Sequence, residues 1–166
     1  MKTTNTQLQT DTVKITRIFK ALPEQVWKAW TEPKRVMRWW GPKIFTSPTC
    51  KIDFREGGKY LFCMRSDSGP EKWQDGIWST GIYKEIVPIK RIVYTDSFAD
   101  ENGNVVDGSY YGMDNFPEEL MVTLTFEKVN GNKTKMVLEQ AGLLSKMIEE
   151  CQVGWNESFD KLEESL

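Results

Sequence analysis

The chain has 166 residues, a length typical of one domain, and a net charge of −2 with acidic and basic residues interspersed. It contains no basic block that would neutralise phosphates and no apolar stretch of spanning length, so we expect neither a nucleic-acid partner nor membrane insertion. Because histidine is absent, Ser–His and Cys–His nucleophile pairs and histidine-based zinc or iron sites are excluded, and we expect no cofactor.

The N-terminal part of the chain predicts a tail, one strand and two short helices. Residues 1–11 are polar and are expected to form a flexible tail. Alternating apolar residues over 12–19 predict the strand. Pro23 suits the first turn of a helix, and Pro33 opens a second helix that Gly41-Pro42 ends.

Six further segments alternate in the manner of strands, bounded by turn residues. They lie at 46–54, 60–65, 76–86, 91–98, 120–126 and 134–140. Gly81, inside one of these strands, predicts a bulge or a close approach of another chain segment. Residues 99–117 form a long loop rich in Asp, Asn and Gly, and loops of this kind often act as lids.

A change of hydrophobic period predicts one long helix over residues 147–166, about 20 residues and roughly 30 Å in length. Its apolar stripe consists of Ile148, Cys151, Trp155, Phe159, Leu162 and Leu166. An antiparallel sheet of consecutive strands needs a cover for its apolar face, and no other predicted element is long enough. The expected fold class is α+β: a curved antiparallel sheet of about seven strands wrapped on a long C-terminal helix, with two short helices after the first strand.

Six short segments, taken in order, resemble a known family. They are PEQVWKAW (23–30), WWGP (39–42), EGGKY (56–60), GIYKEI (81–86), RIVYT (91–95) and GWNESF (154–159). Together they resemble the SRPBCC (START-like) superfamily and, within it, the heat-shock-protein-90 ATPase activator homologue-like group. The resemblance implies a single helix-grip domain over residues 12–166, with a cavity between the sheet and the C-terminal helix.

The implied cavity suggests a set of lining residues rich in aromatic and methionine side chains. On the C-terminal helix the candidates are Met147, Cys151, Trp155 and Phe159, unless this stripe only packs on the sheet. Elsewhere the candidates are Trp40, Phe62, Met64, Trp78, Tyr94, Asp96, Phe98 and Met121. Trp40 has the alternative role of capping the core, and the strand register, which decides the inward face, stays open.

Two carboxylates are candidates for chemistry in such a cavity. Asp96 has the same strand parity as Tyr94 and Phe98, and Glu139 lies near the end of the last strand. A carboxylate in an apolar cavity has a raised pKa and can act as an acid or a base. The alternative for each of them is a solvated or ion-paired carboxylate on the surface.

The three cysteines are widely separated and odd in number, which suits free thiols in a reducing compartment and predicts a cytoplasmic protein. The favoured function is non-enzymatic binding of a hydrophobic or amphipathic small molecule. One alternative is an interaction module for a chaperone, with an exposed apolar patch at Tyr110, Tyr111 and Met113. The second is a cofactor-free cyclase or hydrolase that uses a buried carboxylate. Free sheet edges are compatible with a monomer or a homodimer.

Overall fold

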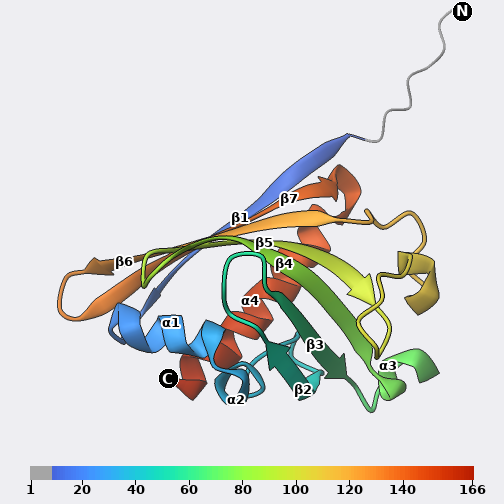
Figure 1. The fold of residues 1–166 in the computed structure, drawn as a ribbon, viewed down its shortest axis with the longest axis horizontal. Helices are drawn as coiled ribbons and strands as arrows, with labels where there is room; N and C mark the ends of the chain where they lie inside the picture. Colours follow the sequence, from blue (N-terminus) through green and yellow to red (C-terminus); the bar gives the residue numbers. More distant parts are fainter. Residues whose placement is uncertain (1–8) are drawn as a thin grey trace, which may run out of the picture.

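Seven strands form one antiparallel sheet in residues 9–166, the part of the chain that this computed structural model describes (Figure 1). The strands are β1 (Thr10–Phe19), β2 (Thr46–Ile52), β3 (Lys59–Arg65), β4 (Ile77–Val87), β5 (Arg91–Ala99), β6 (Leu120–Val129) and β7 (Lys133–Leu144). The helices are α1 (Pro23–Thr31), α2 (Pro33–Val36), α3 (Glu71–Asp75) and α4 (Ile148–Ser165), with 3-10 turns η1 (Gly108–Tyr111) and η2 (Ser145–Met147).

The strand order in the sheet is β1-β7-β6-β5-β4-β3-β2, so β2 to β7 follow one another as a meander. β1 closes the far edge by pairing with β7. Gly131 in the β6–β7 turn has a positive φ of 71°, as tight hairpins of this kind require. The predicted fold class is confirmed: a curved antiparallel sheet, two short helices after the first strand and one long C-terminal helix.

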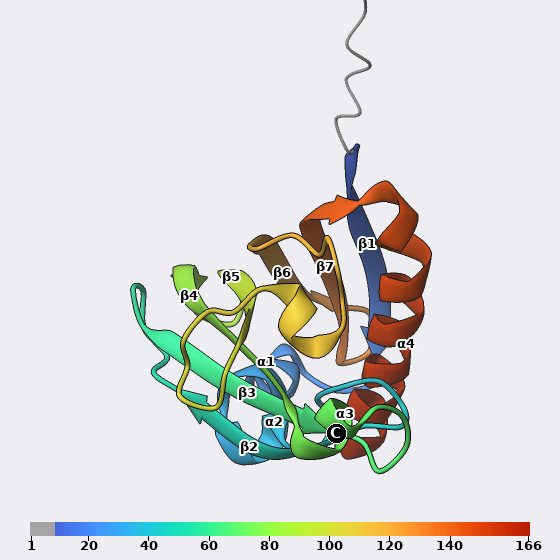
Figure 2. The same ribbon diagram turned by 90° about the vertical axis from the view of Figure 1, so that its right-hand side faces the viewer.

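The strand register decides which side chains face α4, and we call this side of the sheet the inner face. Phe62 lies opposite Ser79, and Ser79 lies opposite Phe98 across the next strand boundary. Val122 lies opposite Gln140 on the same face. Figure 2 shows α4 running along this side of the curved sheet, so that the sheet and the helix enclose the interior between them.

Most of the space under the C-terminal half of α4 is filled by rings, which we call the aromatic cluster. Its members are Trp30, Trp39, Trp40, Trp155 and Phe159, with ring centroids 4.6 Å apart for Trp30–Trp39 and 6.3 Å apart for Trp30–Trp40. Trp39 and Phe159 are fully buried. The Trp39 indole N–H donates to the Ala29 carbonyl oxygen at 2.9 Å, so burial leaves no polar atom of this ring unpaired.

Two basic side chains hold α4 in place. Arg17 on β1 pairs with Asp160 at 2.6 Å and also donates to the Asn156 carbonyl oxygen at 3.0 Å. The Lys161 ammonium donates to the carbonyl oxygens of Pro42 and Phe45 at 3.1 and 2.9 Å. The helix is therefore fastened both to the sheet edge and to the loop after α2.

Some boundaries differ from the prediction. β1 begins at Thr10, two residues inside the expected tail, and residues 1–8 of that tail lie outside the described residues. The short helix α3 was not expected in the β3–β4 connection. Across residues 9–166 no helix is long and apolar enough to cross a membrane.

Gly81 marks a close approach, the second of its two predicted roles. A Cβ added there would lie 1.7 Å from the Thr95 carbonyl oxygen, which no side chain allows. The register shift between β4 and β5 occurs instead between Tyr83 and Glu85. The backbone of β5 therefore depends on glycine at position 81.

Candidate functional site

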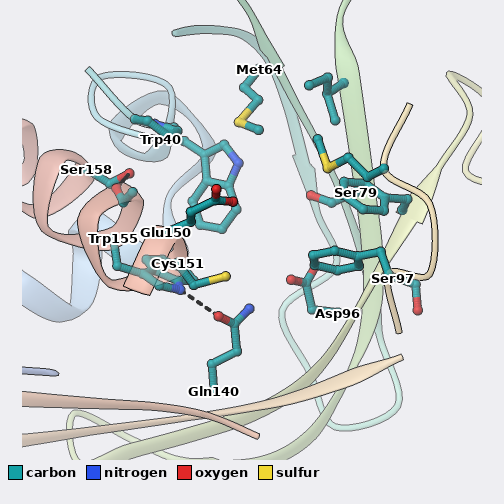
Figure 3. A pocket seen from close by; sticks show the side chains of 17 residues that line it. Trp40, Met64, Ser79, Asp96, Ser97, Gln140, Glu150, Cys151, Trp155 and Ser158 are labelled. Carbon is teal, nitrogen blue, oxygen red and sulfur yellow. Dashed lines mark hydrogen bonds between the residues drawn. The ribbon is translucent and has the colours of Figure 1, made fainter. Parts of the chain in front are cut away.

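A pocket of about 280 Å³ opens between the N-terminal half of α4 and the inner face of the sheet (Figure 3). It is lined by Trp40, Gly41, Pro42, Met64, Ile77, Ser79, Asp96, Ser97, Phe98, Met113, Phe116, Gln140, Glu150, Cys151, Gly154, Trp155 and Ser158. Most of this lining is apolar, and the polar groups are few. Such a cavity is typical of a small-molecule site.

Four parts of the chain make the walls. On the sheet, Met64 lies opposite Ile77, so both side chains reach the pocket from neighbouring strands. On α4, the lining residues recur at helical spacing from Glu150 to Ser158, which turns one stripe of the helix inward. The loop between β5 and β6 adds Met113 and Phe116, and the loop after α2 completes the enclosure.

Asp96 provides one of the two carboxylates that line the pocket. Its Oδ1 lies 3.0 Å from the Tyr60 hydroxyl, which also lies 2.8 Å from the Thr95 carbonyl oxygen. Burial raises the pKa of Asp96 from 3.8 to about 6, and the hydrogen bond from Tyr60 opposes part of that rise. The carboxylate is thus mostly ionised at neutral pH and becomes protonated in mild acid.

Gln140 provides a hydrogen-bond donor from β7. Its side chain is 5% exposed, and its Oε1 accepts a hydrogen bond of 2.8 Å from the Trp155 indole N–H. Because an indole nitrogen only donates, this bond fixes the amide orientation and leaves the NH₂ group to the pocket (Figure 3). No hydrogen bond within the described residues uses that NH₂ group.

All three cysteines are free, and their thiols are weak nucleophiles. Burial raises the pKa of Cys151 to about 11, of Cys63 to about 11 and of Cys50 to about 12. Cys151 is the one that lines the pocket, and it is partly accessible there. The thiol form predominates at neutral pH, so Cys151 contributes a soft apolar surface to the wall.

Six of the twelve candidate residues line the pocket: Trp40, Met64, Asp96, Phe98, Cys151 and Trp155. Phe62, Tyr94 and Phe159 face the same interior but are packed in the core, exposed by 3%, 3% and 0%. Met147 packs on the edge of that core just before α4 and does not reach the pocket. Trp40 combines its two expected roles, because it is 9% exposed, belongs to the aromatic cluster and lines the pocket.

Two expected placements are wrong, because the side chains of Trp78 and Met121 lie on the outer face of the sheet; for Glu139 the surface alternative holds. Trp78 pairs with Cys63 and Ala99, one residue out of phase with the inner-face row. Met121 is 38% exposed and also out of phase. Glu139 is exposed and lies 3.9 Å from Lys14, so it does not face Asp96 as a second acid would.

The remaining lining residues were not predicted as cavity residues. Gln140 had a usable signal: it shares the strand parity of the buried Met136 and Leu138, and a polar residue on an apolar face is informative. The two loop residues at positions 113 and 116 had none, because no periodicity indicates where a loop folds back. Gly154 and Ser158 are small residues on the inward side of α4 that lie outside the predicted apolar stripe.

The long loop does not form the expected exposed patch. Tyr111 is 6% exposed, packs with Phe45 and Ile77 and donates its hydroxyl to the Ala99 carbonyl oxygen at 2.5 Å. Tyr110 is 45% exposed, with the Lys72 ammonium 3.9 Å from its ring centroid. Met113 lies in the pocket wall, so the three residues do not share one exposed surface.

The described part of the chain offers no cluster of metal ligands. Among residues 9–166, no group of three or more Cys, Asp and Glu side chains is arranged to hold a metal ion. The chemistry available at the pocket is therefore that of two carboxylates, one amide, one thiol, hydroxyls and aromatic faces.

Comparisons with known proteins agree with this architecture. The family model described as activator of Hsp90 ATPase homolog 1-like protein matches residues 20–166. Protein CV1439 from Chromobacterium violaceum has a similar structure, with a TM-score of 0.71 and 27% identity over 92% of this chain and 94% of that one. No curated protein matches the sequence.

Two more distant solved structures share the fold. The AHSA1 protein SPO3351 from Silicibacter pomeroyi has a TM-score of 0.69 at 18% identity, covering 93% of this chain and 96% of its own. CalU16 from Micromonospora echinospora has a TM-score of 0.63 at 22% identity, covering 94% of this chain and 76% of its own. These likenesses support the architecture and leave the ligand to be argued from the pocket.

Proposed function

This chain belongs to the activator of Hsp90 ATPase homolog 1-like family, and within that family we propose that it binds a hydrophobic or amphipathic small molecule in the pocket beneath α4. The observation that carries the proposal is the pocket itself: about 280 Å³, walled by aromatic, methionine and glycine residues. That volume lies just below the range of about 300–1,000 Å³ that ligand pockets typically occupy. A small ring compound fits it better than a long lipid chain.

The polar groups of the pocket suit orientation of a ligand more than catalysis. Asp96 shares the pocket with Glu150 on α4, whereas Glu139 lies on the outer face. The thiol of Cys151 lacks a base that would activate it. Binding uses the apolar walls as well as the polar groups, whereas the hydrolase and cyclase hypotheses use the carboxylates alone.

A binding assay with a neutral naphthalene dye, N-phenylnaphthylamine, tests the proposal. Its fluorescence is expected to rise when it leaves water for the pocket, and Gly154→Leu is expected to weaken binding by about tenfold or more. A Cβ at Gly154 lies 3.5 Å from the Pro42 side chain, so a leucine at this position extends along the pocket wall without a backbone clash. Val153→Leu is the matched control, because Val153 is on the same helix and 56% exposed.

A second measurement on the unmodified protein keeps the test independent of folding of the variant. N-ethylmaleimide should label Cys151 before the two buried thiols, and bound dye should slow that labelling. Dye that fails to bind, or binds without protecting Cys151, would overturn the proposal.

A chaperone partner remains the alternative prediction, supported by the description of the family. Retention of this protein on an immobilised Hsp90-type chaperone, together with a change in that chaperone's ATPase rate, is the result this alternative expects. Chaperone binding that is unchanged in Gly154→Leu would show that the chaperone contacts a surface other than the pocket.

A further inference from the structure

The carboxylate of Asp96 has fewer hydrogen-bond donors than a buried anion needs. An ionised carboxylate offers about four acceptor positions. Within the described residues its one protein donor is the Tyr60 hydroxyl, 3.0 Å from Oδ1. That hydroxyl has a single hydrogen, and the Thr95 carbonyl oxygen competes for it at 2.8 Å. Asp96 therefore shares its only donor and keeps its other oxygen for the pocket.

The groups around Asp96 supply no positive charge. The titratable side chains that face it are acids or neutral groups from three elements: Tyr60 on β3, Tyr94 on β5, and Glu150 and Cys151 on α4. No lysine or arginine from residues 9–166 lines the pocket. A buried charge without a counter-ion is costly, so a cationic occupant would be favoured here and an anionic one disfavoured.

Lys161 on α4 is a cation whose contacts lie outside the pocket. The Lys161 ammonium donates to two backbone carbonyls, those of Pro42 and Phe45, and these contacts hold the loop that carries part of the pocket rim. Burial lowers the pKa of Lys161. Swinging this side chain toward Asp96 would release that loop, so Lys161 does not supply a cation to the site.

The walls suit a cation with an apolar body. Aromatic faces attract a nearby ammonium through the ring quadrupole, and the pocket presents Trp40, Phe98, Phe116 and Trp155. Met64 and Met113 add adaptable apolar surface.

Gln140 adds a second, independent polar point. The side chain is 5% exposed, and the NH₂ group left free by the Trp155 bond is directed into the pocket. It is positioned to donate to an oxygen on the ligand or to a bridging water.

From this arrangement we propose that the pocket selects hydrophobic amines, with the ammonium at Asp96 and the apolar body between the aromatic walls. The proposal rests on the function proposed above and names the ligand class. It predicts discrimination by head group: amines bind best, neutral alcohols bind less well, and carboxylates bind worst because they face Asp96 and Glu150.

Competition against the naphthalene dye tests this order with three compounds that share one apolar body: phenylbutylamine, phenylbutanol and phenylbutyrate. At pH 7.5 the amine is expected to displace the dye at a concentration about tenfold below that of the alcohol, and the carboxylate is expected to be the weakest. Equal potency of amine and alcohol overturns the amine proposal while leaving the binding function intact. Absence of dye binding overturns both.

Asp96→Asn assigns the preference to one side chain. Asparagine keeps an acceptor for Tyr60 but removes the charge, so the advantage of the amine over the alcohol is expected to disappear. Glu139→Gln is the matched control, because it removes a carboxylate from the outer face and should leave the preference unchanged. An amine preference that persists in Asp96→Asn contradicts the assignment.

The pH dependence of the unmodified protein gives a readout that needs no variant. With the pKa of Asp96 at about 6, the amine advantage is expected at pH 7.5 and should shrink by pH 5, where Asp96 is protonated. At pH 6, amine binding should release protons, measured as a dependence of the calorimetric enthalpy on the ionisation enthalpy of the buffer. An amine advantage that is the same at pH 5 and pH 7.5 refutes the role of Asp96.

Discussion

The two halves of α4 cover the same inner face of the sheet, yet one half is packed and the other is hollow. Toward the C-terminus, Phe159 and Leu162 are fully buried against the aromatic cluster. Toward the N-terminus, Cys151 and Gly154 face Ser79 across the pocket. Small side chains on the helix and on the sheet leave an unfilled volume between these two elements.

This difference separates the residues that stabilise the fold from those that hold a ligand. Trp155 lies at the boundary, since it packs on Phe159 with centroids 5.5 Å apart and also donates to Gln140 in the pocket. Ring packing therefore positions the amide that faces the ligand site. Substitutions on either side of this boundary are expected to act on different quantities.

The largest effect is expected in the packed half. Phe159→Ala should lower the free energy of unfolding by about 3–5 kcal/mol, because it removes a fully buried ring and leaves a cavity. Cys151→Ala, on the pocket wall, should cost less than about 1 kcal/mol, since its side chain already borders open space. Chemical denaturation measures both, and equal costs would contradict the distinction between the two halves.

The second effect concerns the carboxylate of the hollow half. The pKa of Asp96 is raised from 3.8 to about 6 in the folded protein, so the folded state binds this proton more tightly than the unfolded chain does. The free energy of unfolding therefore falls as pH rises from about 4 to about 6. Asp96→Asn lacks this loss and should be more stable than the unmodified protein by about 2–3 kcal/mol at pH 7.5.

Urea unfolding at pH 4 and pH 7.5 measures this difference. The gain from Asp96→Asn should be much smaller at pH 4, where the folded protein is almost fully protonated at this position and the unfolded chain is partly protonated. Glu139→Gln serves as the control, because it removes an exposed carboxylate from the outer face. A gain for Asp96→Asn that is equal at both pH values would show that ionisation is not its cause.

The smallest effect is expected at Gly154. Gly154→Ala should stabilise the protein by about 0.5–1 kcal/mol, because glycine inside a helix is entropically costly and the added Cβ makes only ordinary contact with Pro42. The same change should weaken dye binding slightly by narrowing the pocket. Thermal unfolding measures the change in stability, and the dye titration measures the change in affinity. A loss of stability would mean that the pocket wall has no room for a methyl group at position 154.

The fold was predictable because its signals are periodic and local. The apolar stripe of α4, the prolines that open α1 and α2 and the alternation of the strands each act within a few turns or residues. The short helix α3 was missed because residues 71–75 bury no side chain completely and so carry no apolar stripe. Strand order followed from the short connections of the meander.

The site was only partly predictable, because it depends on register and on loop placement. A shift of one residue moves a side chain to the other face, which is why Trp78 and Met121 were misplaced while Met64 and Phe98 reached the pocket. Phe116 arrives from a loop whose path is set by tertiary packing. The pocket is open because small residues on separate elements, such as Ser79 and Gly154, both border it. The sequence of one element alone does not show this.

The close approach at Gly81 has a consequence for how this pocket can change under mutation. The Thr95 carbonyl oxygen occupies the space of a side chain at position 81, and the same oxygen competes with Asp96 for the Tyr60 hydroxyl. Any side chain at position 81 would push β5 away and disturb the carboxylate without touching a ligand. In a saturation mutagenesis screen for ligand binding, position 81 should accept glycine alone. New specificities would then have to come from α4 and the β5–β6 loop, where neighbouring backbone leaves room for variation.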